Sequence, residues 1–180
     1  MEAKRTYPSK QLLFRLFQIM KHLLPALGLA VSFAVSGFTV SVAIPVLLVN
    51  QGFRAVGGQA PTLGFLFLLL ALAIGRGLFR YGEHYFGHYV AFHSLANLRK
   101  LVFAKLRRLA PAKLDRQDSG SLLKMIGEDI EAIEVFFAHT VAPVCTGLIS
   151  ALIMWVFLSR ISPALGFLAL LTYLLLAVVL

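Results

Sequence analysis

The chain has 180 residues and a net charge of +9; 59% of its residues are hydrophobic and only 14% are charged. Soluble domains are about 45–50% apolar and about 25% charged, so this composition excludes an ordinary soluble fold and indicates a membrane protein. The basic residues fall in two blocks between apolar runs, which does not favour nucleic-acid binding. A single cysteine, Cys145, excludes an intrachain disulfide.

The first 21 residues predict a basic tail and a short amphipathic helix. Apolar residues from Leu12 to Met20 recur at helical spacing, while Lys10, Arg15 and Lys21 supply charge. The apolar run that follows is longer than the core of a signal peptide. We therefore expect residues 1–21 to be retained and the helix to lie in the membrane interface.

Four apolar segments follow, and each predicts a membrane-spanning helix. A bilayer core of about 30 Å requires roughly 20 helical residues, and no segment has the two-residue alternation of a barrel strand. The predicted fold class is all-α, a polytopic membrane protein whose long transmembrane helices extend into the cytosol. The predicted spans are about 22–49, 63–81, 135–158 and 164–180.

Lysine and arginine predict the orientation of these spans. The first 21 residues hold five of them and residues 99–124 hold eight, whereas the two other loops carry only Arg54 and Arg160. Because cytoplasmic loops are enriched in positive residues, we expect the N-terminus and the middle of the chain in the cytosol.

Residues 82–134 predict a helical extension with a compact tip. No proline occurs from Thr62 to Ala110, so one helix can run for about 70 Å, over twice the thickness of the hydrocarbon core. The segment PAKLDRQDSGS then breaks the helix, and apolar residues at helical spacing resume at Leu122. The sequence predicts two long antiparallel helices joined at this tip.

Residues 98–144, "LRKLVFAKLRRLAPAKLDRQDSGSLLKMIGEDIEAIEVFFAHTVAPV", resemble the transmembrane domain of ATP-binding-cassette (ABC) exporters with six helices per half. The matching positions are a glycine, a leucine pair, and an aspartate with an aliphatic residue on the returning helix: Gly120, Leu122, Leu123, Asp129 and Ile130. The order of elements also agrees, so residues 22–180 look like the first four helices of such a domain. Within the class, the chain looks most like the thiol (cysteine/glutathione) exporter subunits of the CydC/CydD type.

The resemblance implies a permease that moves a small polar solute, such as a thiol or an amino acid, by alternating access in the bacterial cytoplasmic membrane. It implies that the tip is a coupling helix seated on a nucleotide-binding domain, and an ordinary polar turn is the alternative. The coupling residues would be Leu114, Asp115, Arg116, Gln117, Asp118 and Gly120. The expected partners are the lipid bilayer, that domain, a second exporter half and the solute, but no nucleic acid.

The sequence contains no G-x-x-x-x-G-K-[ST] motif, so no phosphate-binding loop is present in these 180 residues. We expect ATP and Mg to bind in the nucleotide-binding domain, outside this chain, and ATPase activity to belong to the complete transporter. The sequence also ends within the fourth predicted span. We therefore expect an N-terminal part of a longer exporter.

Two arginines and two histidines are candidates for binding. Arg76 and Arg80 lie near the second apolar core, where a charge is costly unless it faces a watery cavity or reaches the interface. Contact with a substrate carboxylate or thiolate is one interpretation, and snorkelling to the interface is the other. His84 and His88, four residues apart, share a helix face.

Two histidines fall short of the four ligands of a closed zinc site, so no metal site is predicted. The thiol-exporter resemblance brings haem association with it, which makes His84 and His88 candidate haem ligands. The alternative function is thus a haem-binding or assembly-scaffold membrane subunit without transport activity. The alternative interpretation is an interfacial aromatic stripe, formed by Tyr81, Tyr85 and Tyr89. In that case the histidines bind no haem and only tolerate the water next to the stripe.

Four acidic residues cluster at the foot of the third predicted span, opposite the basic foot of the second. They are Glu128, Asp129, Glu131 and Glu134. We expect them to pair with the basic residues across the hairpin, with little individual effect on stability because such pairs are solvated.

Overall fold

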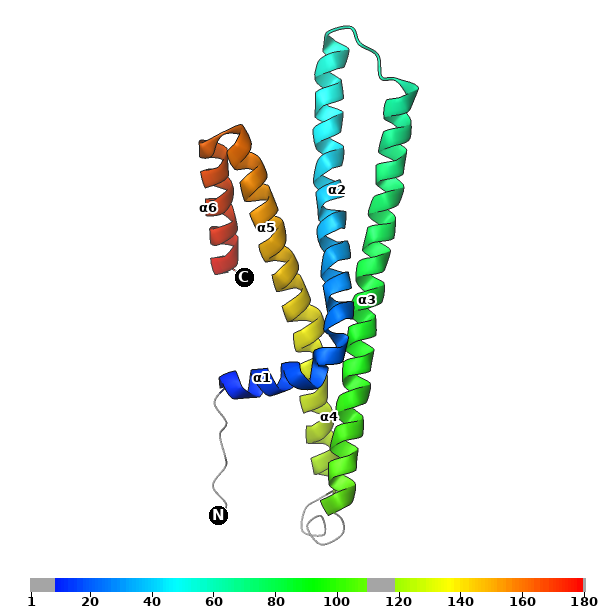
Figure 1. The fold of residues 1–180 in the computed structure, drawn as a ribbon, viewed down its shortest axis with the longest axis vertical. Coiled ribbons are helices and arrows are strands. Elements are labelled where there is room, and N and C mark those ends of the chain that lie inside the picture. Colours follow the sequence, from blue (N-terminus) through cyan, green and yellow to red (C-terminus); the bar gives the residue numbers. More distant parts are fainter. Residues whose placement is uncertain (1–8, 110–118, 180) are drawn as a thin grey trace.

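A computed structural model describes residues 9–109 and 119–179, and within these ranges the chain is helical apart from short connections (Figure 1). Residues 1–8, 110–118 and 180 lie outside the described part. The elements are α1 (Ser9–Met20), the 3₁₀ turn η1 (Lys21–Leu23), α2 (Leu24–Val56), α3 (Leu63–Leu109), α4 (Ser119–Val135), the π-helical segment η2 (Phe136–Val141), α5 (Ala142–Ile161) and α6 (Pro163–Val179). The predicted all-α fold class is confirmed.

Three helical stretches in the described residues are long and apolar enough to cross a membrane. They are Phe17–Val56, Leu63–Arg108 and Ile126–Ile161, and a shorter apolar helix covers Pro163–Leu176. Large apolar side chains on all of them are exposed, which suits helices whose backbone groups are satisfied internally and whose side chains face lipid. The chain is a membrane protein.

Helices α2 and α3 form a long antiparallel pair, α5 leans against α2, and α6 folds back along α5 (Figure 1). As the absence of proline predicts, α3 is one helix of 47 residues, about 70 Å at 1.5 Å per residue. It continues past the start of α2 and packs there against α4. The end of the bundle where the last turn of α3 carries Arg107 and Arg108 is called the basic end below.

The amphipathic helix α1 lies across the bundle where α2 begins (Figure 1). A small buried cluster forms at this crossing, from Met20, Leu23, Leu27 and Val90. Side chains of η2 and the first turn of α5 pack against it, among them Phe136 and Ala142. The cluster therefore joins α1, α2, α3 and the third long stretch near the basic end.

Small residues let α2 and α3 approach closely, as is common between membrane helices. The Phe33 ring lies between Phe79 and Phe86, with ring centroids 6.2 Å and 5.7 Å away. The ring also faces Gly82, where an added Cβ would come within 2.8 Å of it. Nearby, Gly37 leaves room for the Cβ of Phe79.

The third long stretch changes its helical form at η2. Pro143 follows this segment by two residues, has no N–H to donate, and its ring crowds the carbonyl four residues earlier, at His139. A wider π-helical turn before the proline accommodates that crowding. As a result η2 sets the direction in which α4 continues toward the basic end.

Candidate functional site

A cavity of about 470 Å³ lies among α2, α3, the α4–η2–α5 stretch and α6. Its α2 wall is apolar, made of Ala30, Ala34 and Phe38. The polar groups come from the other elements: Glu83, His84, His88, Glu134, His139, Thr146, Ser150 and Tyr173. A mostly apolar cavity with a few converging polar groups is the usual form of a small-molecule site.

The α3 wall presents two imidazoles over small residues. His84, Gly87, His88 and Ala91 share one helix face because they are three or four residues apart. The rings of His84 and His88 are stacked with centroids 6.3 Å apart, and His88 stacks in turn on Phe92 at 5.8 Å. Both imidazoles therefore lie in one row beside the cavity.

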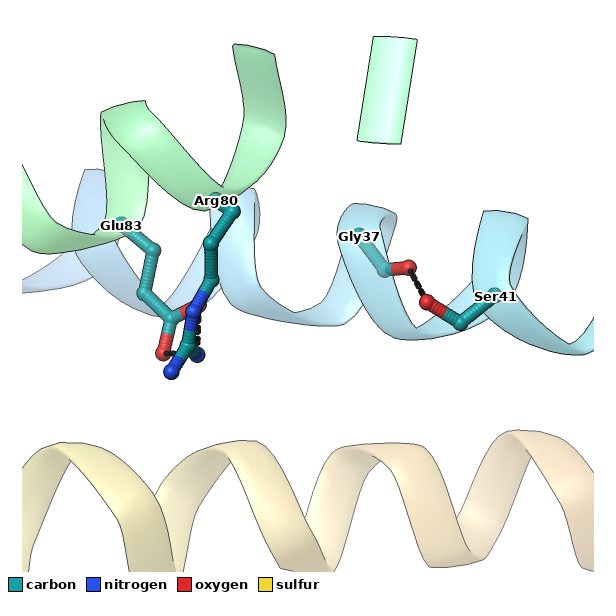
Figure 2. Close-up of polar contacts among 4 residues, drawn as sticks. All are labelled: Gly37, Ser41, Arg80 and Glu83. Atoms are coloured by element: carbon teal, nitrogen blue, oxygen red, sulfur yellow. Dashed lines mark hydrogen bonds and ion pairs between the residues drawn. The ribbon is translucent and has the colours of Figure 1, made fainter. Parts of the chain in front are cut away.

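Glu83 also lines the cavity, and it is paired. Arg80 Nη1 donates to both carboxylate oxygens of Glu83, at 2.8 Å and 3.0 Å (Figure 2). The Arg80 side chain is 64% exposed, against 31% for Glu83. The guanidinium therefore neutralises this carboxylate from outside the cavity.

Glu134 lines the cavity without such a partner. No hydrogen bond or ion pair engages it within residues 9–109 and 119–179. The expected pairing of the acidic run with the basic foot of α3 is wrong for the described side chains, whose ion pairs are both within one helix: Arg80–Glu83 and Lys124–Glu128. A single uncompensated carboxylate thus faces the cavity.

Ser150 brings a buried, unsatisfied hydroxyl to the cavity wall. The residue is only 5% exposed, and among the described atoms its Oγ has no hydrogen-bond partner. Several other helical hydroxyls donate to the carbonyl four residues earlier, as Ser41 Oγ does to Gly37 O at 2.8 Å (Figure 2). A buried unsatisfied hydroxyl costs about 1–3 kcal/mol, so its position beside a cavity calls for an explanation.

The predicted arginines lie outside this cavity wall. Arg76 and Arg80 are exposed on α3, and neither lines the cavity. Their contact with substrate stays a prediction. His84 and His88 do line it, together with His139, which the sequence reasoning did not single out.

The motif residues on the returning helix lie on α4, toward the basic end. Gly120 and Asp129 are exposed on α4, Ile130 is buried, and Leu122 and Leu123 belong to the same helix. The predicted coupling residues Leu114 to Asp118 lie outside the described residues. Their role stays a prediction.

The cavity offers hydrogen-bonding groups and one unpaired charge. In the described part of the chain, no three histidine, cysteine, aspartate or glutamate side chains come together as a metal-binding group. Imidazole nitrogens, hydroxyls and one free carboxylate line the space instead. Such groups can donate and accept hydrogen bonds.

The structure thus defines a helical membrane domain with a mostly apolar cavity between its helices. Residues 23–180 match the family model described as the ABC transporter transmembrane region. The chain belongs to this family. The family implies a nucleotide-binding domain as a partner, and this chain contains only the transmembrane region.

Three relatives from bacteria are similar to the chain. A probable ABC transporter ATP-binding/permease protein of Haemophilus influenzae is 42% identical over 117 residues, which is 65% of this chain and 21% of the relative. The glutathione/L-cysteine transport system ATP-binding/permease protein CydC of Haemophilus influenzae is 34% identical over 91 residues (51% and 16%). The CydC protein of Escherichia coli is 30% identical over 118 residues (63% and 21%). The chain spans at most about a fifth of these relatives.

Proposed function

We propose that this chain belongs to the permease part of an ATP-driven exporter that moves a small polar solute, such as a thiol or an amino acid, by alternating access. ATP is hydrolysed by a nucleotide-binding domain outside this chain, and a second exporter half completes the path. Family membership over residues 23–180 is the observation that carries this proposal. The names of the CydC relatives support a thiol or amino-acid cargo.

The long α3–α4 hairpin supports a mechanical role in that cycle. About 70 Å of continuous helix runs from the α2–α3 loop to the basic end, so a displacement at the tip reaches the membrane part through one rigid element. In the proposal, Leu114 seats in the nucleotide-binding domain, with Asp115, Arg116 and Asp118 around it. ATP-driven closure of two such domains then tilts the hairpins and changes which side the cavity faces.

Leu114→Asp in the assembled transporter tests the coupling. A buried carboxylate at the contact would uncouple ATP hydrolysis from transport, because an unpaired charge in an interface is costly. Substrate-stimulated ATPase activity should fall at least about tenfold. Leu101→Asp, the same substitution at an exposed position of α3, is the matched control. Unchanged stimulation in Leu114→Asp would contradict the assignment.

We also propose that the basic end faces the cytosol of a bacterial cell. The positive-inside rule supports this orientation, since the basic residues of α3 gather at that end. In a Cys145→Ser background, a membrane-impermeant maleimide should label Gln59→Cys in intact cells and Lys124→Cys only after permeabilisation. The reverse pattern would overturn the orientation.

Haem binding is the second candidate function. His84 and His88 line the same cavity and are the residues that would supply an axial imidazole, a common ligand of haem iron. Bound haem would bring redox chemistry; the chain itself would only hold and orient it. A Soret band after haem supplementation that disappears in a His84→Ala/His88→Ala variant would support this candidate. No band in the parent protein would remove it.

A further inference from the structure

The charge of the cavity is set by its two carboxylates. Glu83 is neutralised by Arg80, at 2.8 Å, whereas Glu134 has no partner among the described residues. Among the described residues that line the cavity, none is a lysine or an arginine. The Glu134 carboxylate is therefore the acidic group of the described lining that no ion pair offsets, and the nearby apolar walls weaken the screening of its charge.

The polar groups form a track along one helical stretch. Glu134, His139, Thr146 and Ser150 follow one another from α4 to α5, and all line the cavity. Sixteen residues separate the first from the last, about 24 Å at the rise of an α-helix. The track therefore runs from the carboxylate nearer the basic end to the buried hydroxyl, and it is longer than a single amino acid.

We propose that this cavity recognises its solute by an ammonium group, which Glu134 captures and the hydroxyls of Thr146 and Ser150 then receive. An ammonium has only donors, and this track offers acceptors: a carboxylate, neutral imidazole nitrogens and hydroxyl oxygens. The unpartnered Ser150 Oγ is then satisfied by the solute. This inference rests on the proposed transport function, and it narrows the cargo to cationic or zwitterionic amines.

Anions are disfavoured for the same reason. A carboxylate without an amine would meet the uncompensated Glu134, and the described cavity wall has no lysine or arginine to offset the repulsion. Zwitterionic amino acids can still bind, because their ammonium group contacts Glu134. Solutes of equal size should therefore differ in binding affinity according to the sign of their charge.

The first test is ligand binding by the full 180-residue chain in lipid nanodiscs at pH 7.5, where free imidazole is largely neutral. The probes are cysteine, its amine-only analogue cysteamine and its carboxylate-only analogue 3-mercaptopropionate, compared by saturation-transfer NMR. Cysteamine and cysteine should bind at least about tenfold more tightly than 3-mercaptopropionate, as expected for a hydrogen bond to a charged group. Equal affinities would overturn the proposal.

Variants assign the selectivity to Glu134. Glu134→Gln should remove the preference for amines, whereas Glu131→Gln, an exposed carboxylate on the same helix that does not line the cavity, should keep it. Ser150→Ala should weaken the binding of cysteamine several-fold while leaving the chain folded. An equal effect of the Glu131 and Glu134 variants would contradict a specific site.

Transport assays separate this inference from the proposed function. If the assembled transporter moves none of the probes but the chain still selects amines through Glu134, the exporter proposal fails and the binding site stands. If the transporter moves cysteine and Glu134→Gln leaves its selectivity unchanged, the transport function stands and the ammonium site is wrong.

Discussion

Gly82→Ala tests the close packing of α2 on α3. The added Cβ would lie 2.8 Å from Cγ and Cδ1 of the Phe33 ring and 3.0 Å from Cε1. The ring cannot simply swing away, because Phe86 stacks on it at 5.7 Å and Phe79 lies at 6.2 Å on another side. Either the ring leaves its rotamer or the two helices separate.

Two opposing terms decide the sign of the effect. Forcing an extra carbon into a packed interface costs about 1–3 kcal/mol. Replacing glycine by alanine inside a helix gains about 0.8–1.0 kcal/mol. We therefore expect Gly82→Ala to be neutral to about 2 kcal/mol less stable than the parent. Gly77 lies on the same helix with open space around it. Gly77→Ala should therefore show the gain in helix propensity without a clash.

The assay is unfolding of the purified chain by SDS in mixed micelles, followed by circular dichroism. The difference between the two alanine variants removes the propensity term and isolates the clash, about 1–3 kcal/mol. Phe33→Leu in both backgrounds completes a double-mutant cycle and should remove most of this difference. Equal midpoints for Gly82→Ala and Gly77→Ala would refute the packing described for Phe33.

Three further substitutions are read by the same unfolding assay. Ser150→Ala removes an unpartnered buried hydroxyl and should stabilise the chain by up to about 1–3 kcal/mol, so a loss of stability would contradict the missing partner. Gly166→Ala places a methyl group against Oγ of Ser159 and 2.9 Å from its Cβ, a clash of about 1–3 kcal/mol that the helix-propensity gain of about 0.8–1.0 kcal/mol partly offsets. The variant should therefore be neutral to about 2 kcal/mol less stable, and a gain in stability would show that the turn relaxes freely. Asn97→Ala removes the 2.7 Å bond to His22 Nε2 and should cost only about 0.5–1.5 kcal/mol, because the bond is exposed; a larger cost would indicate a more buried junction.

The fold was accessible from the sequence because its signals are local. Apolar length, the absence of proline before Ala110 and the turn residues after it act within one stretch of chain, and they correctly predicted the continuous α3. The π-helical form of η2 was missed. It depends on how Pro143 adjusts to a helix already fixed by packing on both sides, which periodicity does not report.

The candidate site was less accessible because it is assembled from distant segments. The i, i+4 spacing placed His84 and His88 on one face, but it did not show that His139 and Ser150 line the same cavity. The Glu134 carboxylate was expected to pair across the hairpin, since sequence gives the number of charges but not the faces on which they lie. In the structure the described basic side chains of α3 remain exposed, and Glu134 is left free.

Arg80 has two interpretations that a single variant separates. On sequence it is a candidate contact for a substrate carboxylate, whereas in the structure it reaches Glu83 at 2.8 Å from outside the cavity wall. Because the arginine is 64% exposed, the pair adds little to stability, at most a few tenths of a kcal/mol, and Arg80→Gln should unfold at nearly the parent midpoint. Any change in ligand binding is then not a folding effect.

The direction of that change depends on the role of the arginine. If Arg80 only neutralises Glu83, Arg80→Gln leaves a second free carboxylate in the cavity, and cysteamine should bind several-fold more tightly while 3-mercaptopropionate binds more weakly. If Arg80 holds a substrate carboxylate, cysteine should bind more weakly and cysteamine, which has no carboxylate, should be unaffected. Cysteamine is the deciding probe, because only the first role changes its affinity.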